Sequence, residues 1–265
     1  DHRDLHSFPT RRSSDLIIKH LKQLIRKTLH RLGFYISSTD SINYLELMLY
    51  GYLKHKEKVF FIQIGANDGI STDPIYNFVT LNNNRVSGIA IEPMKDVYEQ
   101  LKNNYKGYSN VIFENIAIHN SKSEMSLYRV DPKYSEKLPK WTKGIASFNK
   151  SHHELSGTPS KYIIPESVHC ISFDSLLTKH NIKRVDLLQI DTEGYDAEII
   201  LEVDFSVIRP SIIHFEHGLK DGVMSKDRFS KVVEKLRKYD YEIMIEPYDV
   251  IAYQKNVLTS DELFM

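Results

Sequence analysis

Two apolar runs of this sequence, residues 185–190 and 212–215, lead into side chains that can move a proton. Asp191 and Glu193 follow the first run, and His217 follows the second. A carboxylate or an imidazole within reach of a hydroxyl group can accept its proton, and histidine is suited to this role at neutral pH. We therefore expect catalytic residues here. The structural alternative is that Asp191 and Glu193 only favour the start of a helix.

The same two runs also predict a candidate metal site. Asp191 and Glu216 stand at their ends. Carboxylate oxygens bind hard cations such as Mg²⁺, and a bound cation lowers the pKa of a coordinated hydroxyl group. General-base and metal-assisted chemistry both stay open, with the general base favoured, and dialysis against EDTA distinguishes them.

A second group of residues has the spacing of a ligand-binding turn after the apolar run 59–64. Its members are Gly65, Ala66, Asn67, Asp68 and Gly69. Two glycines four positions apart allow a tight turn in which backbone approaches a ligand, just before a helix begins. We expect this segment to lie under the amino-acid end of a cofactor, with Asp68 near its amine.

Glu92 ends the next apolar run, residues 86–91, and is a candidate for binding a ribose. A carboxylate at the end of the second strand can accept hydrogen bonds from both ribose hydroxyls. Glu92 follows Gly69 by 23 residues, close to the ~20 expected in nucleotide-type sites. The turn lacks the G-x-G-x-x-G order and the lysine of phosphate-binding loops. S-adenosylmethionine, which has a ribose and no pyrophosphate, therefore fits better than NAD or ATP.

Further binding residues are expected after the third strand and in a long interruption of the pattern. Asn115 ends the run 111–115 and Ala117 follows it, and both should border the adenine. Residues 131–165 contain four prolines, two glycines and several aromatic and histidine residues. A segment of this length is usually functional or disordered, and its composition favours a substrate-facing loop. Its candidate substrate contacts are Trp141, Ser147, Phe148 and His152.

The elements that must position these residues alternate between short apolar runs and amphipathic segments. Strands are predicted at 59–64, 86–91, 111–115, 185–190, 212–215, 241–245 and 250–254. Helices are predicted at 42–54, 74–81, 97–105, 197–202 and 229–239. This alternation indicates an α/β fold with a mostly parallel sheet covered on both faces. Only four residues separate the last two strands, so the final strand should be antiparallel.

Several of these motifs together resemble the FkbM family of S-adenosylmethionine-dependent methyltransferases, over residues 59–255. They are Gly65-Ala66-Asn67-Asp68-Gly69, Ile91-Glu92-Pro93, Asn104, Ile190-Asp191-Thr192-Glu193-Gly194-Tyr195 and residues 210–216. The resemblance implies the three-layer, Rossmann-like class I methyltransferase fold, with seven strands and a reversed last strand. It also implies O-methylation of hydroxyl groups on sugars, surface polysaccharides or natural products. One departure is Gln189, where the family often has lysine.

Two other functions remain open from the sequence. One is N-methylation of an amino sugar or a peptide, which the mass of the product from a hydroxyl-only acceptor would distinguish. The other is a cofactor-binding module that regulates a glycosyltransferase, although such a module has no need of Asp191 and Glu193.

Charge and composition exclude several classes of protein. The 265 residues include 35 basic and 35 acidic side chains, and no apolar run is long enough to span a membrane. The absence of a basic excess argues against a nucleic-acid substrate. Cys170 is the single cysteine, so an internal disulfide is excluded and a cytoplasmic protein is expected.

The N-terminal part is expected to differ from the domain at 59–265. Residues 1–16 resemble translated sequencing-adapter read-through, and we expect them to be a non-native scar. Residues 17–58 form a predicted helical extension with eight basic and three acidic side chains. Its basic amphipathic helix, residues 17–32, is expected to pack on the domain or on a second copy of the chain in a homodimer. The alternative is docking on a partner protein or on the inner face of a membrane.

Overall fold

The computed structural model describes residues 42–139, 142 and 144–257, together with Leu21, Ile25, Thr28 and Leu29. The chain forms two compact units, residues 1–47 and 48–265. Helix α2 (Tyr44–Lys54) agrees closely with the helix predicted at 42–54. The proposed scar and most of the basic helix 17–32 lie outside the described residues.

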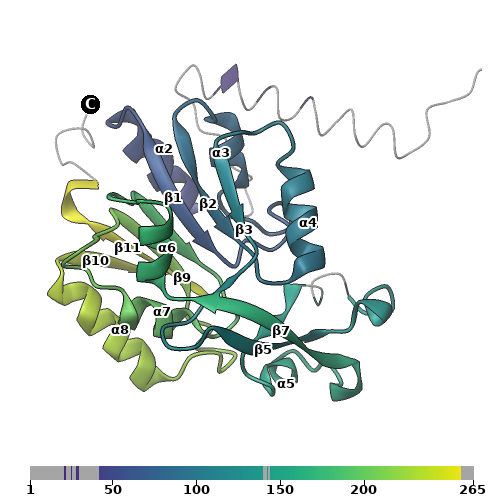
Figure 1. Cartoon of the computed structure of the whole chain (residues 1–265). Helices are drawn as coiled ribbons and strands as arrows, with labels where there is room; N and C mark the ends of the chain where they lie inside the picture. The colour runs from purple at the N-terminus through teal and green to yellow at the C-terminus, as the bar shows by residue number, and fades with distance from the viewer. Residues whose placement is uncertain are drawn as a thin grey trace, which may run out of the picture. The chain divides into compact units, whose positions relative to one another are not determined.

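A seven-stranded sheet forms the centre of the larger unit (Figure 1). Its strands lie in the order β10-β11-β9-β8-β1-β2-β3. In chain order they are β1 (Val59–Ile64), β2 (Val86–Ile91), β3 (Val111–Glu114), β8 (Leu187–Ile190), β9 (Ile212–Glu216), β10 (Tyr241–Ile245) and β11 (Asp249–Gln254). Neighbouring strands are parallel except for β11, which is antiparallel to both β9 and β10. This order, with a reversed last strand, confirms the predicted class I methyltransferase fold.

Amphipathic helices connect these strands. They are α3 (Tyr76–Leu81), α4 (Lys95–Asn104), α6 (Phe173–Lys179), α7 (Asp196–Glu202) and α8 (Lys226–Lys238). Side chains of α6, α7 and α8 share one buried core with Ile62, Leu188 and Ile213 of the central strands. Helix α6 is absent from the sequence prediction. Ser172 caps its N-terminus, because the Ser172 hydroxyl oxygen accepts a hydrogen bond from the N–H of Ser175.

A second, four-stranded sheet interrupts the alternation and was not predicted. Its order is β4-β7-β5-β6, and its strands are β4 (Ala117–Ile118), β5 (Glu124–Val130), β6 (Ala146–Ser147) and β7 (Ile163–Ile171). Figure 1 shows β5 and β7 side by side, below the strands of the large sheet. Leu127, Val168 and Cys170 of this sheet pack against Met94 and Val97 at the start of α4. This contact holds the small sheet against the start of α4, the helix that follows β2.

The predicted loop 131–165 is more structured than its composition suggests. It contains the short helices η1 (Pro132–Tyr134), α5 (His152–Leu155) and η3 (Ser160–Tyr162), besides β6. Its last three residues already belong to β7. The segment is therefore an insertion between two paired strands, and its ends are held by the small sheet.

Candidate active site

A cavity of about 530 Å³ opens where strands β1, β2 and β8 end. The large sheet contributes Gly65, Glu92 and Asp191 to its wall. Side chains of β5 and the insertion face them across the cavity and include Leu127, Arg129, Pro132, Ser135, Ala146 and Phe148. The cavity thus lies at the carboxyl edge of a parallel sheet, where such folds bind ligands.

The glycine turn is fixed by its contacts with β2 and β8. The N–H groups of Gly65 and Ala66 both donate to the carbonyl oxygen of Ile91. Gly65 has a φ of +81°, and a Cβ atom there would lie 1.8 Å from the carbonyl oxygen of Asp191. Only glycine fits so close to a second strand end. The turn therefore leaves room for a ligand by bringing two strand ends into contact.

The other predicted residues of this turn divide between the cavity and the core. Asn67 and Asp68 line the cavity. The Asp68 carboxylate also accepts hydrogen bonds from the N–H groups of Ile70 and Ser71, which shape the turn. Ala66 is buried, and neither Ala66 nor Gly69 lines the cavity. A Cβ atom at Gly69 would lie 2.5 Å from Leu101 Cδ1. These two residues shape the backbone rather than the cavity wall.

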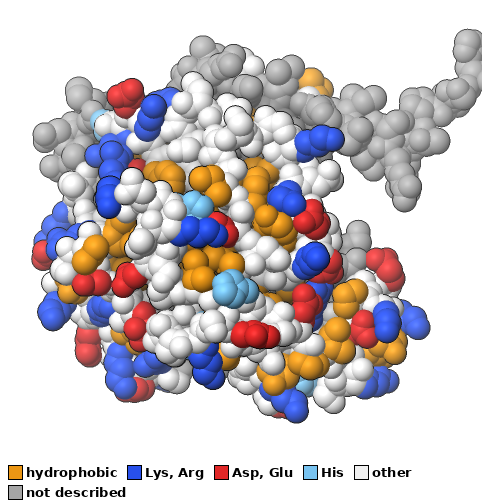
Figure 2. All heavy atoms as spheres, in the orientation of Figure 1, with side chains coloured by type: hydrophobic (Ala, Val, Ile, Leu, Met, Phe, Trp, Pro, Cys, Tyr) orange, Lys and Arg blue, Asp and Glu red, His pale blue; other side chains and the backbone are white. Residues whose placement is uncertain are grey.

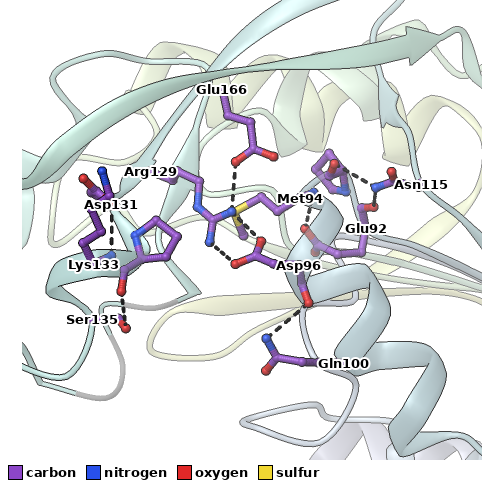
Figure 3. Close-up of polar contacts among 12 residues, drawn as sticks. Glu92, Met94, Asp96, Gln100, Asn115, Arg129, Asp131, Lys133, Ser135 and Glu166 are labelled. Carbon is purple, nitrogen blue, oxygen red and sulfur yellow. Dashed lines mark hydrogen bonds and ion pairs between the residues drawn. The ribbon is translucent and has the colours of Figure 1, made fainter.

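Glu92 lines the cavity and is almost fully buried, with 3% of its surface exposed. Its Oε2 accepts a hydrogen bond from the N–H of Asn67 at 3.0 Å. Its Oε1 accepts one from the N–H of Met94 at 2.8 Å (Figure 3). Burial raises its pKa to about 7, although both hydrogen bonds and the charge of Arg129 lower it. Each carboxylate oxygen keeps a free lone pair for a ligand hydroxyl.

The structure corrects the role predicted for Asn115. Its Nδ2 donates to the carbonyl oxygens of Glu92 and Pro93, both at 2.9 Å (Figure 3), and it does not line the cavity. Asn115 therefore holds the turn after β2 in place. Ala117 lies in the cavity wall, together with Ile116 and Ile118.

Asp191 and Glu193 both reach the cavity. The pKa of Asp191 is raised well above its ordinary value, first by desolvation and then by the negative charges of Glu193, Asp196 and Glu216. Glu193 has a φ of +53°, which is rare for a residue with a side chain. Its Oε2 lies 2.9 Å from His152 Nε2, and its carbonyl oxygen accepts a hydrogen bond from the Ser147 hydroxyl at 2.7 Å.

Ser147 and His152, which were predicted as substrate contacts, instead hold Glu193. Neither belongs to the cavity lining, and both are buried. Trp141 lies outside the described residues. Phe148 does line the cavity, where its ring lies edge-on to that of Tyr195 with centroids 5.1 Å apart.

His217, predicted as a general base, bonds to backbone groups and does not line the cavity. Its Nε2 donates to the carbonyl oxygen of Glu246 at 3.0 Å, and its Nδ1 accepts the N–H of Leu219 at 3.1 Å. Both ring nitrogens are thereby used within the protein, and the residue is absent from the cavity lining. The ring packs on Phe229 instead.

The structure brings only one member of the predicted metal pair, Asp191, to the cavity wall. Glu216 is the last residue of β9 and does not line the cavity, whereas Asp191 does. Among the described residues, the group of metal-competent side chains that lies within 4.8 Å consists of His214, Glu246 and Asp249, and it includes neither member of the pair. Gln189 is likewise buried in β8 outside the cavity, so the departure from lysine does not alter the cavity wall.

Asp196 and Arg129 are structural residues of the site that sequence reasoning missed. The buried Asp196 carboxylate accepts the N–H groups of Thr192 and Glu216, both at 3.1 Å, and so joins the ends of β8 and β9. Arg129 donates to Asp96 Oδ1 at 2.6 Å and to Glu166 Oε2 at 2.9 Å (Figure 3). Its position on the inward face of the alternating strand β5 was the available signal.

The visible surface carries mixed charges. Figure 2 shows blue and red side chains interspersed over this face of the molecule. Within the part of the chain that the structure describes, no helix is long and apolar enough to cross a membrane.

Comparison with known proteins shows which family the chain resembles. A family model described as the methyltransferase FkbM domain matches residues 63–243. No curated protein matches the sequence.

Several solved structures are similar to this chain at low sequence identity. A precorrin-6Y C5,15-methyltransferase from Geobacter metallireducens is 13% identical, with 83% of this chain and 94% of that chain covered and a TM-score of 0.39. A SAM-dependent O-methyltransferase from Thermotoga maritima is 12% identical, with 90% and 73% covered and a TM-score of 0.42. Aeropyrum pernix fibrillarin, solved with S-adenosyl-L-methionine, is 11% identical, with 74% and 66% covered and a TM-score of 0.35.

Proposed function

The chain belongs to the FkbM family of S-adenosylmethionine-dependent methyltransferases, and from this premise we propose that it methylates a hydroxyl oxygen of a sugar, a glycan or a natural product. The observation that carries the proposal is the Asp191 carboxylate, which faces the cavity and has a pKa raised well above its ordinary value. Such a carboxylate is a better proton acceptor than an ordinary one.

The residues of the cavity fit the cofactor. Glu92 offers free lone pairs to the ribose hydroxyls, and the Gly65 turn leaves room for the amino-acid end. Met94, Val97 and Ile116 give an apolar wall suited to the adenine. When bound, S-adenosylmethionine supplies the methyl group that the acceptor oxygen receives.

The acceptor would lie between Asp191 and the aromatic side chains opposite. Tyr195 stacks on His119 with ring centroids 5.4 Å apart, and Phe148 meets Tyr195 edge-on. Phe148 and Tyr195 line the cavity and present apolar surface suited to the C–H face of a sugar ring. Asp191 would accept the hydroxyl proton, while His152 holds the neighbouring carboxylate of Glu193.

Transfer of a labelled methyl group from S-adenosylmethionine to sugar, polyol and amine acceptors tests this function. We expect labelled product from hydroxyl acceptors, and we expect Asp191→Asn to lower kcat by about 10²–10⁴-fold. Asp221→Asn, which changes an exposed carboxylate outside the cavity, is the matched control. Product from amine acceptors alone would contradict O-methylation and support N-methylation.

The metal alternative has its own test. Proton acceptance by Asp191 requires no cation, so we expect the initial rate to survive dialysis against EDTA. Loss of activity that Mg²⁺ restores would contradict the general-base proposal and revive the metal-assisted one.

A further inference from the structure

A cluster of three potential metal ligands lies on β9 and the β10–β11 hairpin, outside the cavity. A ring nitrogen of His214 and carboxylate oxygens of Glu246 and Asp249 all lie within 4.8 Å of one another. None of the three residues lines the cavity. The cluster therefore lies outside the cavity wall, although the Asp249 charge is one of those that act on Asp191.

The strand register explains how these side chains meet. In the antiparallel pair of β9 and β11, His214 is opposite Ile251 and Glu216 is opposite Asp249. Residues two apart on a strand share a face, so His214 and Asp249 point to the same side of the sheet. The turn before β11 brings in Glu246, whose N–H donates to the Asp249 carbonyl oxygen at 2.8 Å.

His214 supplies an independent indication that the cluster has a ligand. Only 7% of its surface is exposed, and its Nδ1 has no hydrogen-bond partner among the described residues. A buried polar atom without a partner is unfavourable by about 1–3 kcal/mol. Coordination of a cation through Nδ1 would remove this cost.

The charges around the cluster also favour a cation. Within the described part of the chain, neither Glu246 nor Asp249 forms an ion pair with lysine or arginine. The register places a third carboxylate, Glu216, directly opposite Asp249. A divalent ion would offset this local excess of negative charge.

We propose that His214, Glu246 and Asp249 bind a divalent transition metal ion. One imidazole and two carboxylates suit Zn²⁺ or Mn²⁺, whereas Mg²⁺ prefers oxygen ligands and retains its water. Three protein ligands leave coordination positions for water. The site would join β9 to the hairpin that carries the reversed last strand.

Isothermal titration of the EDTA-treated, full-length protein with ZnCl₂, MnCl₂ and MgCl₂ tests the proposal. We expect one Zn²⁺ or Mn²⁺ ion per chain, bound at least about tenfold more tightly than Mg²⁺. His214→Gln and Asp249→Asn should each weaken this binding by more than about tenfold. Glu242→Gln, which alters an exposed carboxylate on β10, should leave it unchanged.

Glu246→Gln keeps the test valid if the buried His214 variant fails to fold, because Glu246 is partly exposed in a turn. Circular dichroism of each variant reports folding. The proposal is overturned if the wild-type protein binds these ions only at millimolar concentration, if Mg²⁺ binds as tightly as Zn²⁺, or if folded Glu246→Gln and Asp249→Asn bind like the wild type. S-adenosylmethionine affinity, measured in parallel, reports on the methyltransferase site independently.

Discussion

The carboxylate of Glu92 should make cofactor binding depend on pH. Burial raises its pKa to about 7, and only the charged form accepts hydrogen bonds from both ribose hydroxyls. We therefore expect the affinity for S-adenosylmethionine to rise as the pH increases through about 7. Titration calorimetry across this range, on the wild type and on Glu92→Gln, measures the effect.

Glu92→Gln should bind more weakly and lose most of this pH dependence, whereas Glu99→Gln, an exposed change on α4, should keep it. Stability should respond in the opposite direction. Because the folded-state pKa lies above the ordinary value of 4.5, the Glu92 contribution to the free energy of unfolding falls as the pH rises from 4.5 to about 7. A pH-independent affinity in the wild type would contradict the assignment to the ribose.

His152 is expected to act through Glu193. Its Nε2 lies 2.9 Å from Glu193 Oε2, while the imidazole itself is outside the cavity wall. His152→Gln should lower kcat by about 10–100-fold through misplacement of the carboxylate, with cofactor affinity unchanged. His169→Gln, an exposed change on β7, is the control. Equal losses in both variants would indicate a general structural effect.

The residues at strand ends were predictable, but their side-chain directions were not. Asp191 and Glu193 follow a buried strand and do reach the cavity. His217 follows the neighbouring strand equally closely, yet both its ring nitrogens bond to backbone groups. Position after a strand fixes the edge of the sheet, whereas the turn that follows decides where the side chain points.

Among the elements, the turn after β1 should tolerate no side chain at Gly65. In Gly65→Ala the new Cβ atom would meet the Asp191 carbonyl oxygen, so the ends of β1 and β8 must separate. We expect a more than tenfold loss of cofactor affinity and a lower free energy of unfolding. Gly107 also has a positive φ, +98°, but open space surrounds it. Gly107→Ala should therefore lower the free energy of unfolding only by the strain of a left-handed backbone, about 1–2 kcal/mol.

Chemical denaturation and cofactor titration of both glycine variants provide the comparison. Wild-type cofactor affinity in Gly65→Ala would show that the turn does not need this close approach. The same result would show that the cavity does not depend on the contact between the ends of β1 and β8.

The small sheet should depend on Arg129 for its attachment to α4. The Arg129 guanidinium is buried and pairs with Asp96, which is about half exposed. Arg129→Met should lower the free energy of unfolding by about 1–3 kcal/mol. A double-mutant cycle with Asp96→Asn, measured by urea denaturation, gives the coupling between the two side chains. Additive effects would contradict this attachment.

The large sheet could be predicted from the sequence because continuous apolar runs indicate strands that are buried on both faces. The small sheet did not, because β5 alternates polar and apolar residues and is half exposed. Residues 131–162 between β5 and β7 separate the pairing strands by a long insertion. Composition identified that insertion, but only long-range pairing determines where it lies.

At the scale of the whole molecule, the carboxyl edge of the large sheet carries the cavity. Strand β9, the turn before β11 and the reversed strand β11 itself each carry one of the three potential metal ligands. The balance of 35 basic and 35 acidic residues includes a basic excess in residues 17–58. The docking role of helix 17–32, the acceptor and the oligomeric state stay predictions.

The most direct test of the account is calorimetric titration of S-adenosylmethionine into the wild type, Glu92→Ala and Asp191→Asn. We expect one saturable site in the wild type, a more than tenfold weaker affinity in Glu92→Ala, and near-wild-type affinity in Asp191→Asn. No saturable binding to the wild type, or wild-type affinity in Glu92→Ala, would contradict the central claim.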